Sequence, residues 1–269
     1  MVLFLIAAGF SLIFGVMGIL NLAHGALYMV GAYVGWSIAI PLGMNFGLAV
    51  LAGGIAAGLV GLLIERGFLR YLYKQLDEQV LLTFGFIYIL TNLCIWVWGP
   101  YFRSPFTAPF LSGSFSIGEL SFPKSRIFII LVGLILALFL WWLQAKTRVG
   151  AIVRAGMDDK ETTMALGINL DLVFTVVFFL GAFIAGFAGV FGAQILGVNP
   201  MLGIDTLLFA FVVVIVGGVG SVQGSLLGGI IIGMTDSFGR SYFPEFSMFL
   251  MYLAMIAMLA IRPTGLLSR

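Results

Sequence analysis

The sequence predicts an all-α fold, a polytopic transmembrane helical bundle of about eight to nine membrane segments, some of them short or broken. Hydrophobic residues make up 62% of the 269-residue chain and charged residues only 9%, with a mean hydropathy of +1.18. A soluble domain carries roughly 25% charged residues. The chain also holds many apolar stretches near the ~20 residues that a bilayer-spanning helix needs. Its 36 glycines suit close helix packing in lipid.

The apolar segments are separated by two substantial polar loops, 65–78 and 145–171, and one mixed loop, 100–125. Two neighbouring pairs are joined only by "NLAHG" and "GSVQGS", which favours short, broken or re-entrant helices there. Such breaks are tolerated at membrane depth only when they are buried in protein or line a polar cavity. The expected segments are 2–20, 22–40, 45–64, 79–99, 126–144, 172–196, 205–222, 224–239 and 247–261.

The placement of Lys and Arg predicts the orientation of the bundle. If every segment crosses the membrane, nine of the thirteen cations fall on one side, which we take as cytoplasmic. The N-terminus is then outside and the C-terminus inside. The nine are Arg66, Arg70, Lys74, Lys146, Arg148, Arg154, Lys160, Arg262 and Arg269.

Loop 65–78 has two open interpretations. Arg66, Arg70 and Lys74 are four residues apart and share one helical face, while leucines occupy another. This pattern is typical of a short amphipathic helix lying on the membrane surface. A simple extension of the preceding helix with snorkelling cations explains it equally well.

The few polar residues within the apolar segments are candidates for function, because polar groups in lipid are costly. Asn21, His24, Gln194 and Gln223 are the main ones. Alternatively, Asn21 and His24 satisfy backbone groups where a helix breaks. Asp205 fits a helix N-cap better than a proton-coupling site.

Several function classes lack the residues they need. There is no G-x-x-x-x-G-K-[ST] phosphate loop and no Gly-Lys pair. The single Cys94 offers no disulfide framework or Cys-based metal site, and one His makes a poor proton relay. The net charge of +2 is too small to argue for nucleic acid. We therefore expect a non-enzymatic chain that binds no metal or cofactor.

The most charged stretch of the chain is "RAGMDDKETTMALGI", residues 154–168. A helical plot places Met157, Met164 and Ala165 near one side, with charges over much of the rest. Gly167 is a natural helix stop. On the cation-rich side of the membrane, the sequence favours a short amphipathic helix that seats in a groove on another protein. The alternative is an ordinary solvated loop.

Three stretches of the chain stand out together: "GFSLIFGVMGILNLAHGALYMVGAYVGW" (9–36), "RAGMDDKETTMALGINLDLV" (154–173) and "FVVVIVGGVGSVQGSLLGGIIIGMTDS" (211–237). In their order and spacing they resemble the permease subunits of ABC importers for branched-chain amino acids. The resemblance runs over essentially the whole chain and is closest to the shorter, LivH-type permease. It implies a single transmembrane permease domain over 1–269 in a bacterial inner membrane. Family members usually carry a further apolar stretch before the part that matches Leu3 to Phe14, whereas this chain starts at Met1.

The resemblance also implies partners. A complete importer needs a second, longer LivM-type permease, two cytoplasmic ATPase subunits that use ATP, and a periplasmic substrate-binding protein. The cytoplasmic loop 145–171 matches the segment that couples the permease to an ATPase, through Arg154, Ala155, Asp158, Glu161, Ala165 and Gly167. The translocation path then runs along the interface with the partner permease. We expect it to be lined by Asn21, His24, Gln194 and Gln223 and shaped by Gly217, Gly218, Gly220 and Gly224.

Three alternatives remain open at this point. The same family includes importers of urea, short amides and sugars, and composition does not separate these cargoes. A self-sufficient secondary transporter or channel would show a coupling-ion site, such as paired intramembrane acids. A membrane-embedded enzyme would show clustered His, Asp or Glu in its spans.

Overall fold

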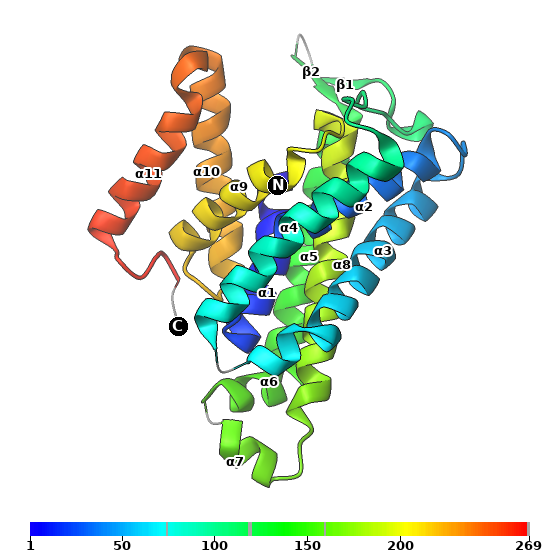
Figure 1. The fold of residues 1–269 in the computed structure, drawn as a ribbon. Coiled ribbons are helices and arrows are strands. Elements are labelled where there is room, and N and C mark those ends of the chain that lie inside the picture. The colour runs from blue at the N-terminus through cyan, green and yellow to red at the C-terminus, as the bar shows by residue number, and fades with distance from the viewer. Residues whose placement is uncertain (74, 118–119, 159, 268–269) are drawn as a thin grey trace.

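The computed structural model describes residues 1–73, 75–117, 120–158 and 160–267, without the side chains of 117, 120, 149, 157, 158 and 160–162. This part of the chain forms a helical bundle with a small antiparallel hairpin at one end (Figure 1). The hairpin pairs β1 (Ser114–Ile117) with β2 (Leu120–Pro123). The helices are α1 (Val2–Met17), α2 (His24–Ala39), α3 (Phe46–Gly67), α4 (Leu76–Trp98), α5 (Lys124–Lys146), α6 (Arg148–Asp158), α7 (Lys160–Ala165), α8 (Leu170–Leu196), α9 (Leu202–Gly217), α10 (Val222–Tyr242) and α11 (Ser247–Ile261).

The all-α bundle is confirmed, but the count of eight to nine membrane segments is not. Among the described residues, five helical segments are long and apolar enough to cross a membrane. The count becomes six if α9 and α10, which meet at 113°, form one span. The helices α1 and α2 have 16 residues each, which is shorter than a bilayer-spanning helix normally needs.

Helix α8 is the centre of the bundle and packs against α1, α2 and α3 (Figure 1). Small residues permit this close packing. A Cβ on Gly31 of α2 would lie 2.3 Å from the Cα of Gly186 on α8, so the two backbones touch directly. By contrast, α4, α5 and α11 expose many large apolar side chains, as expected for helices that face lipid or another protein.

Both predicted helix breaks are present. The first lies between α1 and α2, where Gly18 adopts a left-handed conformation with φ of 65° and ends α1. The second lies between α9 and α10, where Gly218 and Gly220 have φ of 105° and 80°. Glycine has no Cβ and adopts such angles without strain.

Two local expectations change. Loop 65–78 does not form a surface helix: α3 extends through Arg66 to Gly67, a 3-10 turn, Leu69–Leu72, follows, and residue 74 lies outside the described residues. Asp205 is not an N-cap, since α9 begins at Leu202 and Asp205 lies in its first turn. The charged central segment is helical over α6 and α7, on either side of residue 159, which lies outside the described residues.

Candidate functional site

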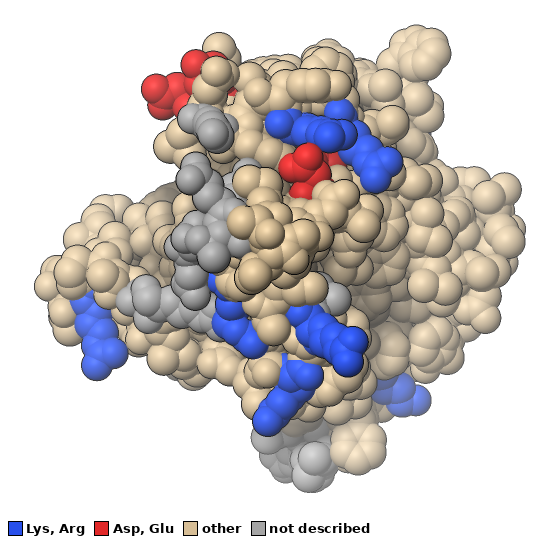
Figure 2. Space-filling view, turned by 90° about the horizontal axis from the view of Figure 1, so that it is seen from below, with Lys and Arg blue, Asp and Glu red and all other residues tan. Residues whose placement is uncertain are grey.

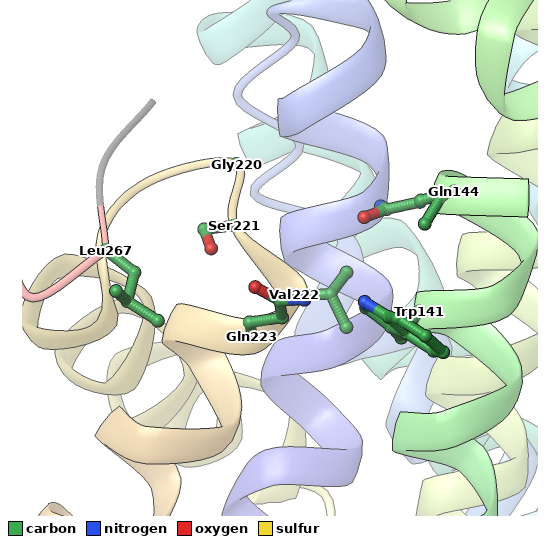
Figure 3. Close-up of a pocket in the computed structure, with 8 residues that line it drawn as sticks. Trp141, Gln144, Gly220, Ser221, Val222, Gln223 and Leu267 are labelled. Carbon is green, nitrogen blue, oxygen red and sulfur yellow. The ribbon is translucent and has the colours of Figure 1, made fainter.

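A groove between α5 and α10 contains the predicted path residue Gln223. Trp141 and Gln144 project into it from α5, opposite Ser221 and Gln223 from the start of α10 (Figure 3). The cavity measures about 260 Å³ and is bounded on another side by Leu267 of the C-terminal segment. The side chain of Gln223 is exposed to it. A polar molecule in this groove would meet amide, hydroxyl and indole groups.

The groove continues along α5 and α10 as an apolar cavity of about 370 Å³. The two cavities share Trp141, Val222 and Gln223, so they form one surface depression. The apolar part is lined by Leu134, Ala137, Leu138 and Leu226 together with the shared residues. Because Leu134, Leu138 and Trp141 of its lining are exposed, a second protein surface could pack against this depression.

The break between α9 and α10 positions the polar end of this groove. The backbones of Gly217 and Gly224 approach so closely that a Cβ on Gly217 would lie 2.2 Å from the Gly224 carbonyl oxygen. Ser221 caps α10, because its Oγ accepts a hydrogen bond from the Gly224 N–H at 3.0 Å. The C-terminal segment is tied to the same place, since the N–H of Leu267 donates to the Gly217 carbonyl. Gly217 and Gly224 thus hold Gln223 at the groove.

Asn21 and His24 lie in the interior, with 0% exposed surface. The Nε2 of His24 donates to the Ile6 carbonyl on α1 at 3.0 Å, because a carbonyl oxygen only accepts. The His24 ring also stands edge-on to Phe10 at 5.5 Å. Within the described part of the chain, the side-chain amide of Asn21 and the Nδ1 of His24 make no hydrogen bond.

The first break is braced by a residue that sequence reasoning did not single out. The Thr83 hydroxyl of α4 accepts a hydrogen bond from the Leu22 N–H at 3.2 Å. Thr83 is fully buried, and it donates in turn to the Gln79 carbonyl within its own helix. A break inside the bundle leaves backbone N–H groups without helical partners, and this hydroxyl satisfies one of them.

Gln194 lies near the end of α8 at the hairpin end of the bundle. The chain that follows it pairs with the hairpin-side loop, because the N–H of Arg103 donates to the Val198 carbonyl and that of Val198 to the Arg103 carbonyl. Gln194 is buried, and its amide makes no hydrogen bond among the described residues. The structure therefore does not bring the four predicted path residues together. Among the described residues, no group of three or more His, Cys, Asp or Glu is placed to hold a metal ion.

The α6–α7 segment projects from the opposite end of the bundle (Figure 1). Seen from that end, Lys and Arg side chains gather on the surface around it (Figure 2). The buried face of α6 consists of Gly150, Val153 and Gly156, spaced as one helical stripe. Arg154 lies against the end of α5, where its guanidinium donates to the Gln144 carbonyl. Helix α6 is thus fixed to the bundle through one face.

The other side of this segment is exposed. Ala155 and Ala165 are exposed, and Met164 and Leu166 are apolar side chains with 46% and 75% of their surface exposed. Gly167 ends the segment with φ of 81°, and its N–H bonds to the Met164 carbonyl. The side chains of Asp158 and Glu161 lie outside the described residues. Exposed apolar side chains at the tip of a charged projection are suited to contact another protein.

A buried carboxylate, Glu65, was missed because it was read as the first residue of a polar loop. It falls on the same face of α3 as Gly54, Gly58 and Gly61, since these residues recur at three- and four-residue spacing. A Cβ on Gly54 or Gly58 would lie 2.7 Å from a ring atom of α8, so this face packs on α8. The spacing of the glycines was the available signal.

Comparison with known proteins places these features in context. Residues 1–259 match the family described as "Branched-chain amino acid transport system / permease component". The high-affinity branched-chain amino acid transport system permease protein LivH of Escherichia coli K12 is 30% identical, with 98% of this chain and 91% of that protein covered. BraD of Pseudomonas aeruginosa is also 30% identical over the same shares of the two chains. LivM of Escherichia coli K12 is 28% identical over 99% of this chain and 68% of that protein. No solved structure gives a significant match.

Proposed function

The chain belongs to the family of permease components of branched-chain amino acid transport systems, and we propose that it is the LivH-type transmembrane subunit of an ATP-driven ABC importer for branched-chain amino acids. The observation that carries this proposal is the end-to-end similarity to high-affinity branched-chain amino acid permeases. The subunit is non-catalytic. ATP is hydrolysed by two cytoplasmic ATPase subunits, and a periplasmic binding protein delivers the substrate.

The proposed orientation places the α6–α7 end in the cytoplasm of a bacterial cell and the hairpin end outside its inner membrane. The cations Arg66, Arg70, Arg148 and Arg154 come from segments at the α6–α7 end, and cytoplasmic loops are generally rich in Lys and Arg. The C-terminal segment packs beside the second break, close to Gln144 at the same end of α5. This supports a cytoplasmic C-terminus.

The proposed translocation path is the α5–α10 groove, closed on its open side by a longer LivM-type permease. The second break lies directly at this groove, and a bundle tolerates irregular backbone where it lines a polar cavity. Gln223 and Gln144 would hydrogen-bond the charged ends of an amino acid, while the apolar part of the groove suits a branched aliphatic side chain. Asn21, His24 and Gln194 lie inside the bundle, away from this groove, and are therefore weaker candidates for lining the path.

The proposed ATPase docking element is the α6–α7 segment. Its apolar tip residues Met164 and Leu166 would seat in a groove of the ATPase, with Ala155 and Ala165 leaving room for close approach. Arg154 fixes α6 to α5, and Gly167 allows the sharp turn into α8. Asp158 and Glu161 belong to the same element, and their roles in docking remain part of the proposal.

The test is reconstitution. The chain is co-expressed with a longer permease, two ATPases and a periplasmic binding protein from the same genome, purified through a tag on this chain, and placed in liposomes. Uptake of radiolabelled leucine that needs both ATP and the binding protein supports the proposal. Uptake by the chain alone without ATP would instead establish a secondary transporter or channel. ATP-driven uptake of urea or ribose, with no uptake of leucine, would keep the family and assign a different substrate to the importer.

A further inference from the structure

Glu65 is a carboxylate with 0% exposed surface near the end of α3. Its Oε1 accepts a hydrogen bond from the Tyr73 hydroxyl, and its Oε2 accepts one from the Thr175 hydroxyl at 2.9 Å. A buried carboxylate is costly unless its oxygens are hydrogen-bonded or paired. Hydrogen bonds to a carboxylate are also stronger than those between neutral groups. This arrangement therefore joins three segments firmly.

The two donors come from segments on either side of Glu65. Tyr73 belongs to the loop between α3 and α4, and Thr175 lies in the second turn of α8, shortly after the α6–α7 segment. Two further contacts join the same segments. The rings of Tyr73 and Phe174 meet edge to face at 5.5 Å, and Arg70 pairs with Asp171 at 3.3 Å. We call these contacts of Asp171, Phe174 and Thr175 with Arg70, Tyr73 and Glu65 the α8 latch.

The start of α8 also contacts the α6–α7 segment. A Cβ on Gly156 of α6 would lie 2.9 Å from the Leu170 Cδ2, so Leu170 packs directly on α6. Beside this contact lies a cavity of about 440 Å³, lined by Gly156 and Gly18 together with Tyr73 and Phe174 of the latch. Helix α6 therefore contacts the start of α8 through Gly156 and Leu170, beside a cavity that residues of α1 also line.

We propose that Glu65 is a positioning residue that ties the first turns of α8 to α3, so that a movement of the α6–α7 segment is passed into the helix bundle. The inference rests on the proposed function, in which this segment docks an ATPase. With the latch intact, a push on α6 moves α8 and α3 together. Without the α8 latch, the first turns of α8 move independently of α3. The movement of α6 is then not transmitted to the membrane-spanning part of the bundle.

Within the α8 latch, the buried hydrogen bonds of Glu65 hold α8 to α3 more strongly than the Arg70–Asp171 ion pair does. Arg70 and Asp171 expose about half of their side-chain surface, at 52% and 49%, so water and salt screen their attraction. Burial raises the pKa of the Tyr73 phenol, and its hydrogen bond to Glu65 raises that pKa further. The phenol therefore remains protonated, and remains a donor, throughout the physiological pH range.

The test measures ATP hydrolysed per leucine transported by the complete importer in liposomes, at equal amounts of assembled complex. Glu65→Ala is expected to raise this ratio at least about fivefold, the lower end of coupling effects between sites in proteins. Glu65→Gln should stay near the wild type, because an amide accepts from one hydroxyl and donates to the other. The matched control is Glu78→Gln, which changes an exposed carboxylate at the start of α4 and should leave the ratio unchanged.

A purely structural role for Glu65 would lower the amount of assembled importer and leave the ratio unchanged, which would overturn the proposal. If the Glu65→Ala importer does not assemble, the same ratio is measured for Tyr73→Phe and Thr175→Val. Each of these variants removes one hydrogen-bond donor to Glu65 at nearly constant side-chain volume. An unchanged ratio in both variants would equally overturn it. Failure of the wild type to couple ATP to uptake is a different result, since it would refute the proposed function itself.

Discussion

The breaks between α1 and α2 and between α9 and α10 look alike in sequence but differ in their surroundings. Both combine small residues with a side-chain amide between apolar runs, and the first adds the imidazole of His24. At the first, the polar side chains lie in the interior: Asn21 and His24 are fully buried and the Leu22 N–H is held by Thr83, while Gly18 lines the cavity beside α6. The second lies at a cavity, with Gln223 exposed beside Trp141 and Gln144.

This difference separates the two circumstances in which a membrane bundle tolerates an irregular backbone. At the first break, neighbouring helices supply the missing partners and the polar residues belong to the interior. At the second, Gly220 packs on Gly15 of α1, while the groove beside α5 leaves the Gln223 side chain accessible. We expect the first break to govern stability and the second to govern transport.

The largest effect is expected for Gly25→Val, directly after the first break. A Cβ at Gly25 would lie 1.9 Å from the Gly203 carbonyl oxygen and 2.9 Å from the Leu207 Cβ, so two helices would have to separate. Overpacking typically costs about 1–3 kcal/mol, and a backbone clash this close should reach at least about 3 kcal/mol. Thermal unfolding in detergent measures the loss. Gly85→Val, where no heavy atom lies within 4 Å, is the control and should unfold near the wild-type temperature. Equal losses of thermal stability in both variants would contradict the assignment of the first break to stability.

Thr83→Val should destabilise the first break by about 1–3 kcal/mol, because it leaves the buried Leu22 N–H without its acceptor. Thr83→Ser keeps the hydroxyl and should retain most of the stability. The measurement is again thermal unfolding, together with leucine uptake per assembled importer. We expect uptake per assembled importer to stay near the wild type. A loss of uptake in a fully stable Thr83→Val protein would assign this break to the path instead.

The existence of both breaks could be predicted from the sequence, since short polar linkers between apolar runs permit few other structures. Their different environments could not, because they depend on which helix covers each break. Thr83 lies about sixty residues from the first break, and nothing in its own segment indicates that contact. The apolar helices were likewise predictable from their length, whereas the 113° angle between α9 and α10 follows from tertiary packing.

Ser221→Ala should cost about 1 kcal/mol, since it removes the N-cap of α10 at the second break. Because the cap orients the first turn, leucine uptake should also fall moderately. Ser221→Asn restores an oxygen acceptor and should recover both properties. Asn45→Ala removes an equivalent cap at the start of α3, away from the groove, and provides the comparison. If both alanine variants lowered uptake equally, the effect would reflect general stability and not the groove.

Gln223→Ala should have the smallest effect on stability, within about 0.5 kcal/mol, because the side chain is exposed. If it hydrogen-bonds the substrate, uptake should fall roughly five- to tenfold, the equivalent of about 1 kcal/mol. The readout is the rate of leucine uptake at fixed importer concentration. Gln75→Ala, an exposed glutamine before α4, should leave the rate unchanged. An unchanged rate in Gln223→Ala would remove Gln223 from the path.

The candidate site was only partly predictable. Gln223 was identified because an amide within an apolar segment is unusual, but its neighbours Trp141 and Gln144 resembled ordinary residues at a helix end. Glu65 was assigned to a loop because it precedes Arg66, although the glycine spacing along α3 placed it on a packed face. In both cases the decisive information was the position of a helix distant in sequence.

Thiol accessibility in the assembled importer tests the contrast between the breaks most directly. The single native cysteine, the buried Cys94, is first replaced by Ser, and cysteines are then introduced one at a time as Gln223→Cys and Ala23→Cys. A small water-soluble thiol reagent is applied to the importer in liposomes with and without ATP and leucine. We predict that the cysteine at 223 is labelled and that transport conditions change its labelling rate, whereas the cysteine at 23 is not labelled. Labelling at 23 with none at 223 would contradict the assignment of the path to the α5–α10 groove.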